Sequence, residues 1–225
     1  MKTLLLSLTY AVGIGELILA VYFWVTNSKS EIRRVMALLA LVTGLWCIGS
    51  AFVAYATVTS SVMFFLKLVY IFGMLITTSL LHFVILFPFP LFTIDRYHKI
   101  LAYIPITVFS GIILFSNLVV SSYSSSYSIA GDTIGGPLFT LYNYLLTALF
   151  VVVVALLIYR FRSTDGSSKK NVLIILISVL LGGLPAVLND LIFYSVDSSL
   201  RINTLVVNLT TVAWLISTTY IVRKK

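Results

Sequence analysis

Long apolar runs, separated by short polar connections, divide the chain into seven segments. Each run is close to the ~20 residues that a helix needs to cross the hydrocarbon core of a bilayer, and each is therefore predicted to be a membrane-spanning helix. The predicted spans cover residues 4–26, 35–57, 62–87, 100–120, 138–159, 172–194 and 204–222. Because the connections are short, the pattern predicts a single all-α domain over residues 1–225, a polytopic seven-helix transmembrane bundle.

The third segment, residues 62–87, is expected to lie at the centre of the bundle. A helix of this length is roughly 39 Å long, more than the ~30 Å of the hydrocarbon core. The segment contains Lys67 and His82, and a charged side chain that faces lipid alone costs about 3 kcal/mol. The other helices are therefore predicted to pack around it.

The composition supports membrane insertion and changes how the net charge is interpreted. Hydrophobic residues make up 60% of the chain and charged residues 10%, far from the roughly 25% charged residues of a soluble domain. The net charge of +8 could indicate nucleic-acid binding, but the basic residues are spread through the connections rather than gathered on one arm. The predicted partner is the lipid bilayer and not a nucleic acid. The single cysteine, Cys47, excludes an internal disulfide and is predicted to be a small packed side chain.

The basic residues also predict the orientation. Twelve of the fifteen Lys and Arg residues lie after the first, third and fifth spans or at the C-terminus. Only Lys2 and Arg201 lie on the opposite side, and Lys67 lies within a span. Because cytoplasmic loops are enriched in Lys and Arg, the N-terminus is predicted outside and the C-terminus in the cytoplasm, with the basic residues as topology anchors.

The longest connection, residues 121–137, is then predicted outside the cell. Its serines, tyrosines and Gly-Gly-Pro end are typical of a loop with turns rather than of a helix. Two interpretations stay open for this loop: a lid over an outward-facing pocket, or a solvated connector.

Two opposite charges are predicted at one depth in the outer half of the bundle. Lys67 lies roughly 7 Å and Asp190 roughly 6 Å from the outer ends of their spans. They are expected either to pair or line one cavity, or to reach the outer interface separately.

Other polar residues gather in the same half and predict a pocket for an unidentified small-molecule or peptide ligand. Gly182, Gly183 and Pro185 are expected to interrupt the sixth helix beside it. The alternative is that the polar side chains only join helices, at about 0.6 kcal/mol per contact. The candidate ligand-binding residues are Lys67, Tyr70, Asn117, Tyr142, Asn143, Asn189, Asp190 and Asn208.

Two further polar residues lie within spans. Glu16 lies roughly 18 Å into the first span, where an isolated carboxyl is expected to be neutral and to serve either as a proton relay or as a hydrogen-bonding group between helices. His82 lies near the cytoplasmic end of its span and is expected to pack at the interface. A haem would need an aligned second histidine, and His98 lies in the following loop, so neither a haem nor another cofactor or metal is predicted.

No catalytic motif is visible in the sequence. The chain contains no Gly-rich phosphate loop, zinc-ligand spacing or nucleophile elbow. Retinal is also excluded, because a microbial rhodopsin carries its Schiff-base lysine in the last helix and residues 204–222 contain no lysine. The chain is therefore not expected to be an enzyme.

Several segments resemble a known family. These segments are GLWCIGSAF (44–52), FFLKLVYIFG (64–73), IPITVFSGIILFSN (104–117), GGPLFTLYNYLL (135–146) and TYIVRKK (219–225). They are similar to the N-terminal seven-helix sensor region of bacterial and archaeal histidine kinases. The resemblance implies a receptor module in the cytoplasmic membrane of a prokaryote that passes a helix movement to a cytoplasmic kinase or diguanylate cyclase domain, with a homodimer as an open alternative. Because the sequence ends three residues after the last span, it is expected to be either part of a longer receptor or a module that acts through a partner chain.

The favoured hypothesis is a sensory module in which a signal changes packing around Lys67, Asn117, Asn189 and Asp190 and moves span seven relative to span three. One alternative is a small solute or proton-coupled transporter that uses Glu16, Lys67 and Asp190. Another is a structural membrane subunit that packs through the small residues of segment 11–15.

Overall fold

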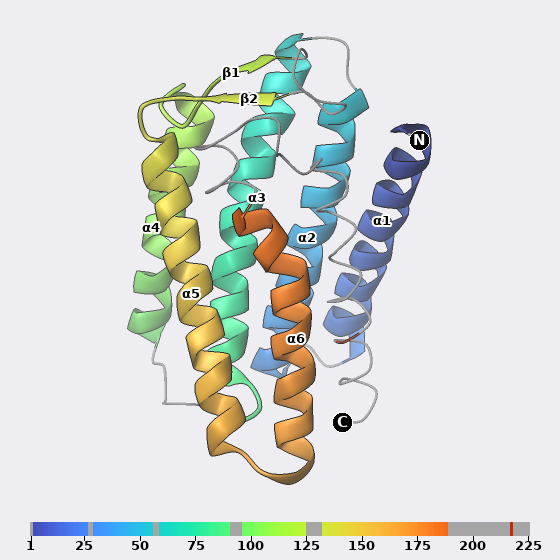
Figure 1. Cartoon of the computed structure of the whole chain (residues 1–225), viewed down its shortest axis with the longest axis vertical. Helices are drawn as coiled ribbons and strands as arrows, with labels where there is room; N and C mark the ends of the chain where they lie inside the picture. The colour runs from blue at the N-terminus through green and yellow to red at the C-terminus, as the bar shows by residue number, and fades with distance from the viewer. Residues whose placement is uncertain are drawn as a thin grey trace.

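The computed structural model describes residues 2–26, 29–55, 59–90, 96–124, 132–188 and 217. Within these ranges the chain forms six α-helices and one antiparallel pair of strands (Figure 1). The helices are α1 (Lys2–Thr26), α2 (Glu31–Tyr55), α3 (Thr59–Leu86), α4 (Arg96–Phe115), α5 (Phe139–Ser163) and α6 (Gly166–Leu188), and the strands are β1 (Val120–Ser124) and β2 (Asp132–Gly135).

Five helices, α1, α2, α3, α5 and α6, are long and apolar enough to cross a membrane, and α4 contains a shorter apolar segment, Tyr103–Phe115. The chain is therefore a multi-pass membrane protein. The first six predicted spans each coincide with a helix. The seventh, residues 204–222, lies outside the described residues except for Ser217, which is helical and buried.

The two ends of the bundle differ. β1 and β2 lie across one end, close to α3, α4 and α5, and are called the hairpin end here (Figure 1). A short turn joins α5 to α6 at the opposite end, the turn end. Gly166 opens α6 there with a φ of +59°, a conformation that a residue without Cβ adopts at little cost.

The first two helices pack closely through glycine. A Cβ added to Gly44 would lie 2.8 Å from the carbonyl oxygen of Gly13, so only glycine permits this approach between α1 and α2. Ala11, which begins the small-residue segment noted in the sequence, is exposed on α1.

Two apolar clusters form the core. At the turn end, residues such as Phe23, Phe83 and Leu157 join α1, α2, α3, α5 and α6. At the hairpin end, Met74 and Tyr142 pack with residues of α2, α4 and β1. α3 contributes to both clusters, which supports its predicted central position. Cys47 is buried and in no disulfide, as predicted.

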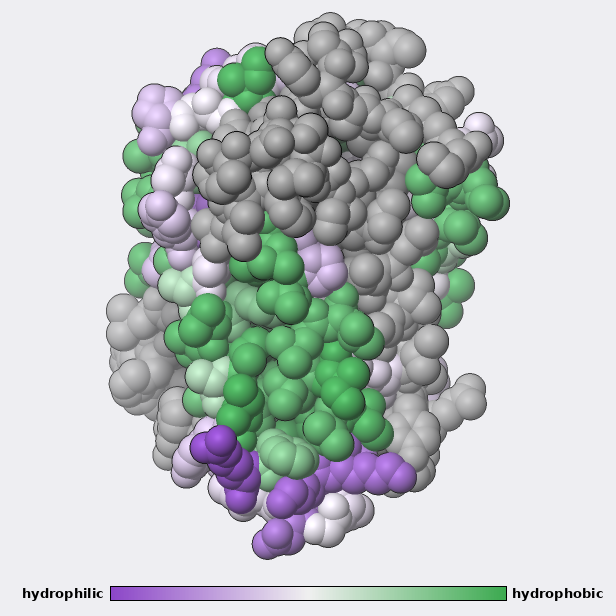
Figure 2. Space-filling model, viewed as in Figure 1, coloured by the Kyte–Doolittle hydropathy of each residue, from purple (hydrophilic) through white to green (hydrophobic). Residues whose placement is uncertain are grey.

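The outer face of α5 and α6 is apolar (Figure 2). The exposed apolar side chains of these two helices include Val151, Ile158, Ile177 and Leu181. Hydrophilic side chains gather at the lower edge of this face, where the α5–α6 turn lies (Figure 2). An apolar band with a polar edge is the pattern expected of a surface in contact with lipid.

The predicted end of the fourth span was wrong, and the connection after it, correctly predicted not to be a helix in its described residues, contains two paired strands that were not predicted. α4 ends at Phe115 rather than at residue 120, because the Ser116 hydroxyl binds the Ile112 carbonyl oxygen at 2.6 Å and accepts a bond from the Leu118 amide at 3.2 Å. The chain then forms a β-hairpin, in which Ser122 pairs with Ile134 and Tyr123 with Thr133. Val119 and Val120 are fully buried, so the start of the hairpin packs against the bundle.

The predicted interruption of the sixth helix was also wrong. α6 continues through Gly182, Gly183 and Pro185 to Leu188, although it changes direction near its end (Figure 1). A Cβ on Gly183 would lie 2.3 Å from the Phe150 ring. Gly183 therefore makes room for a side chain of α5 in the core.

Candidate functional site

The Lys67 ammonium joins α3 to the end of α4. Its Nζ donates to the carbonyl oxygen of Ser116 at 2.8 Å and to Oδ1 of Asn117 at 3.1 Å. Since the last carbonyl groups of a helix lack amide partners and carry partial negative charge, a lysine at this position stabilises the end of α4.

The backbone around Asn117 is held by the base of the hairpin. The Gly136 amide donates to the Val119 carbonyl oxygen at 2.9 Å, and the Leu138 amide donates to that of Leu118 at 2.7 Å. A Cβ on Gly136 would lie 2.3 Å from the Asn117 carbonyl oxygen. Gly136 is therefore needed for the position of Asn117, and through it for the contact with Lys67.

A second contact joins α3 to α5 one turn beyond Lys67. The hydroxyl of Tyr142, which is 1% exposed, donates to the backbone carbonyl oxygen of Tyr70. The two rings meet edge to face with centroids 5.5 Å apart, and Phe139 lies 5.8 Å from the Tyr70 ring. A Cβ on Gly73 would lie 3.4 Å from the Tyr142 hydroxyl, so Gly73 leaves space for this contact.

Asn143 is buried beside Tyr142 on α5. Its exposed fraction is 5%, and its Oδ1 has no hydrogen-bond partner among the described residues. A buried amide without a partner is costly, which makes Asn143 a polar group available to another segment or to a ligand.

The structure thus brings together half of the predicted ligand-binding residues. Lys67, Tyr70, Asn117 and Tyr142 form the hairpin-end cluster, which links α3, α4 and α5. A fifth predicted member, Asn143, follows Tyr142 in α5 and is buried. The remaining three, Asn189, Asp190 and Asn208, lie outside the described residues, so the pairing of Lys67 with Asp190 stays a prediction.

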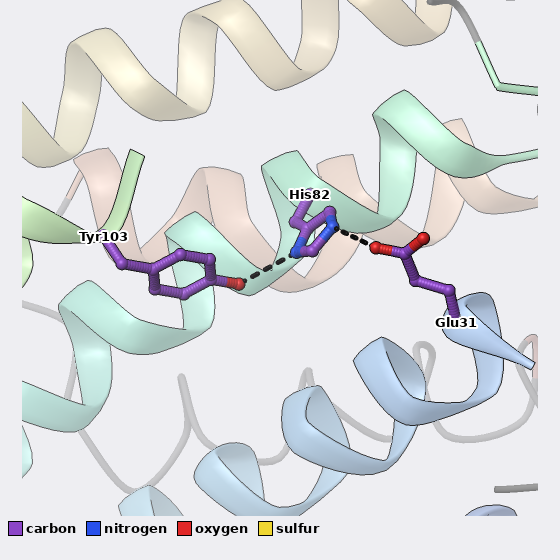
Figure 3. A network of polar contacts seen from close by, with 3 residues as sticks. All are labelled: Glu31, His82 and Tyr103. Carbon is purple, nitrogen blue, oxygen red and sulfur yellow. Dashed lines mark hydrogen bonds and ion pairs between the residues drawn. The ribbon is translucent and has the colours of Figure 1, made fainter. Parts of the chain in front are cut away.

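Near the turn end, His82 connects three helices (Figure 3). Its Nδ1 lies 3.0 Å from the hydroxyl of Tyr103 on α4, and its Nε2 lies 3.4 Å from a carboxylate oxygen of Glu31 on α2. These three residues are called the histidine network. Sequence reasoning placed His82 at an interface but missed both partners. Glu31 opens α2 and His82 lies near the end of α3, so a comparison of depths from the same side of the membrane could have found the pair.

Arg160 near the turn end was expected to be a topology anchor, but it turns into the bundle. It is 5% exposed, and its guanidinium donates to the carbonyl oxygen of Ile85 at 2.9 Å and to that of Phe89. Ile85 lies in the last turn of α3, where carbonyl groups lack helical partners. Arg160 therefore fastens α5 to the end of α3. Its neighbour Arg162 is exposed, as an anchor should be, and no pattern in the sequence separates the two.

Glu16 is completely buried on α1, and neither carboxyl oxygen has a hydrogen-bond partner among the described residues. The prediction of a hydrogen bond between helices is therefore not met within that part of the chain. The described residues also contain no group of three His, Cys, Asp or Glu side chains that could hold a metal ion.

Comparison with known families adds the decisive observation. The family described as the N-terminal 7TM region of histidine kinase matches residues 8–222, nearly the whole chain. The chain belongs to this family. The matched region is the sensory part of the histidine kinases and not their catalytic part, so the chain is a membrane sensory input module. No curated protein is significantly similar to the chain.

Proposed function

We propose that this seven-helix sensor region receives a signal at the hairpin end, outside the cell or at the outer membrane face, and relays it to a cytoplasmic output domain or partner chain. In this proposal the chain has seven spans, with its N-terminus outside and its C-terminus in the cytoplasm. One observation carries the proposal. Three segments that resemble the family, 64–73, 104–117 and 135–146, meet at the hairpin end through Lys67 and Tyr142.

The proposed ligand site includes the hairpin-end cluster and Asn143, together with Asn189, Asp190 and Asn208. Its support is the convergence of polar groups from three helices and the β-hairpin beside them. The Lys67 ammonium and the buried Oδ1 of Asn143 offer a donor and an acceptor, respectively. A ligand that displaces the Asn117 contact of Lys67 changes how α4 is held against α3.

The relay is proposed to use α3 and α5 as one unit. Tyr142 ties α5 to α3 near the hairpin end, and Arg160 ties the same helices near the turn end. The acceptors on α3, Tyr70 and Ile85, are separated by roughly 22 Å along the helix. Two contacts so far apart along α3 resist tilting of α5 against α3.

The output side of the relay is proposed to be the seventh span. Ser178 of α6 is hydrogen-bonded to Ser217, which supports a position of that span beside α6. A movement of the α3–α5 unit then reaches the C-terminus through α6, which packs against α5 in the turn-end core. As in any switch, a ligand drives this movement only if it binds the two packings with different affinity.

The test is a fusion of the whole chain, through Lys225, to the kinase half of a histidine kinase, with autophosphorylation measured in membrane vesicles. Lys67→Met and Tyr142→Phe are expected to change the basal output several-fold, because each removes a contact that sets helix packing. The matched controls are Lys170→Met and Tyr144→Phe, since Lys170 and Tyr144 are exposed. If both test variants give the same output as their controls in several linker lengths, the proposal is wrong.

A second candidate function, proton-coupled transport, is favoured by Glu16 alone. A buried carboxyl without a partner among the described residues is the kind of group that carries protons in transporters. Potential-driven proton uptake into proteoliposomes, lost in Glu16→Gln, would support transport. Equal rates in protein-containing and empty liposomes would exclude it.

A further inference from the structure

The histidine network joins α2, α3 and α4 near the turn end, where two of its side chains are partly exposed. The side chain of Glu31 is 35% exposed and that of His82 is 14% exposed. Protons can therefore reach the imidazole through the carboxylate, although the ring itself is largely enclosed.

The neighbours of His82 determine where its proton lies when the ring is neutral. A carboxylate only accepts hydrogen bonds, so Glu31 favours the tautomer with hydrogen on Nε2. Nδ1 then accepts a bond from the Tyr103 hydroxyl, 3.0 Å away. In this arrangement Tyr103 donates to Nδ1, and Nε2–H lies 3.4 Å from the Glu31 carboxylate oxygen, so the network joins α4 to α3 and α3 to α2.

A second proton changes both contacts. Nδ1 becomes a donor, so the Tyr103 hydroxyl must turn to accept and direct its own hydrogen elsewhere. The contact between Nε2 and Glu31 becomes an ion pair, which is stronger than the neutral bond. Protonation thus strengthens the contact between α2 and α3 and reverses the one between α3 and α4.

We propose that Glu31, His82 and Tyr103 form a proton-binding switch, through which the pH at the turn end adjusts the position of α4 against α2 and α3. The imidazole is the one group of the three whose ordinary titration falls between pH 5 and 8. This second input depends only on the network and not on a ligand at the hairpin end.

Few ionisable groups surround His82 within the described part of the chain. Glu31 faces His82 from α2 and Tyr103 faces it from α4, and the last three turns of α3 contain no other ionisable side chain. The nearest basic residues in the sequence of α2 are Arg33 and Arg34. His82 also precedes Ile85, the acceptor of Arg160, by one turn, so a change at the imidazole lies next to the tie between α3 and α5.

The first experiment measures the protonation state of His82. The full chain carrying His98→Gln, which leaves one histidine, is labelled with ¹⁵N-histidine and placed in lipid nanodiscs. The nitrogen chemical shifts are expected to report the Nε2–H tautomer at pH 8 and a doubly protonated ring at pH 5.5. An unchanged protonation state across this range overturns the proposal.

The second experiment measures the distance between α2 and α4. Spin labels at Leu41→Cys on α2 and Ile104→Cys on α4, both exposed positions, are introduced with Cys47→Ser, and their distance distribution is measured at pH 5.5 and 8. A pH-dependent shift is expected, with loss of that shift in His82→Gln and Tyr103→Phe but not in Tyr159→Phe, a control at an exposed tyrosine. A shift that persists in His82→Gln overturns the proposal. If that variant does not fold, Tyr103→Phe decides in the same way, because it keeps the ring and removes only the hydroxyl.

Discussion

Arg160 offers the sharpest test of how the bundle is held together. Replacement by Met keeps a long apolar stem and removes the guanidinium that binds the carbonyl oxygens of Ile85 and Phe89. Both oxygens then lose a charged donor in a place where Arg160 itself is only 5% exposed. The variant is therefore expected to loosen α5 from the end of α3.

The magnitude follows from two opposing contributions. Each hydrogen bond from a charged donor contributes about 1.5–3 kcal/mol, and each buried acceptor left without a partner costs about 1–3 kcal/mol. Relief from burying a cation offsets part of this loss. A net loss of about 3 kcal/mol is expected, or roughly a hundredfold change in the ratio of folded to unfolded protein. Arg160→Lys keeps the charge without the planar two-point geometry and should lose about half as much.

The assay is reversible unfolding in mixed micelles with increasing mole fraction of SDS, followed by far-ultraviolet circular dichroism. Arg162→Met is the matched control, because Arg162 lies two residues away on the same helix and is exposed. It should change the free energy of unfolding by no more than about 0.5 kcal/mol. Equal losses in Arg160→Met and Arg162→Met would refute the inferred clamp between α3 and α5.

Three other predictions use the same reasoning. Lys67→Met should lower the free energy of unfolding by about 1–2 kcal/mol in the SDS titration, since two contacts at the end of α4 are lost; no difference from Lys170→Met would contradict this role. Gly136→Ala should destabilise the chain, because its Cβ would lie 2.3 Å from the Asn117 carbonyl oxygen. Gly111→Ala, with open space around the added Cβ, should stabilise the chain by about 0.5–1 kcal/mol. A Gly136→Ala variant more stable than Gly111→Ala would show that the hairpin base is not tightly packed. For the orientation, Ser122→Cys with Cys47→Ser should react with a membrane-impermeant maleimide in intact cells, and Ser167→Cys only after permeabilisation; the opposite result would invert the proposed topology.

The helices were largely predictable because apolar runs of this length have few alternatives in a membrane. The first six spans were found, and their bounds differ from the structure by a few residues at most ends. The end of the fourth span was predicted five residues too late, because Val119 and Val120 continue the apolar run but belong to the hairpin. Apolar residues at the end of a span suit a helix and a buried strand equally well, so composition could not separate the two.

The candidate site was predictable in part. Depth in the membrane placed Lys67 and Asn117 in the same half of the bundle, and the structure brings them into contact. Depth says nothing about the direction of a side chain around its helix, which is why Arg160 and Arg162 could not be told apart. Glu31 was missed for another reason: it lies at a helix start, outside the predicted span, where a carboxylate needs no special explanation.

The most direct test of the relay is a reversible lock at the hairpin end, read out at the other end of the chain. Ser122 and Ile134 are paired across β1 and β2, so Cys at both positions, with Cys47→Ser, should form a disulfide. In the fusion to a histidine-kinase output half, reduction with dithiothreitol should change autophosphorylation reversibly, while either single-cysteine variant should not respond. Equal autophosphorylation in the oxidised and reduced double-cysteine protein would contradict the claim that the hairpin end controls the output.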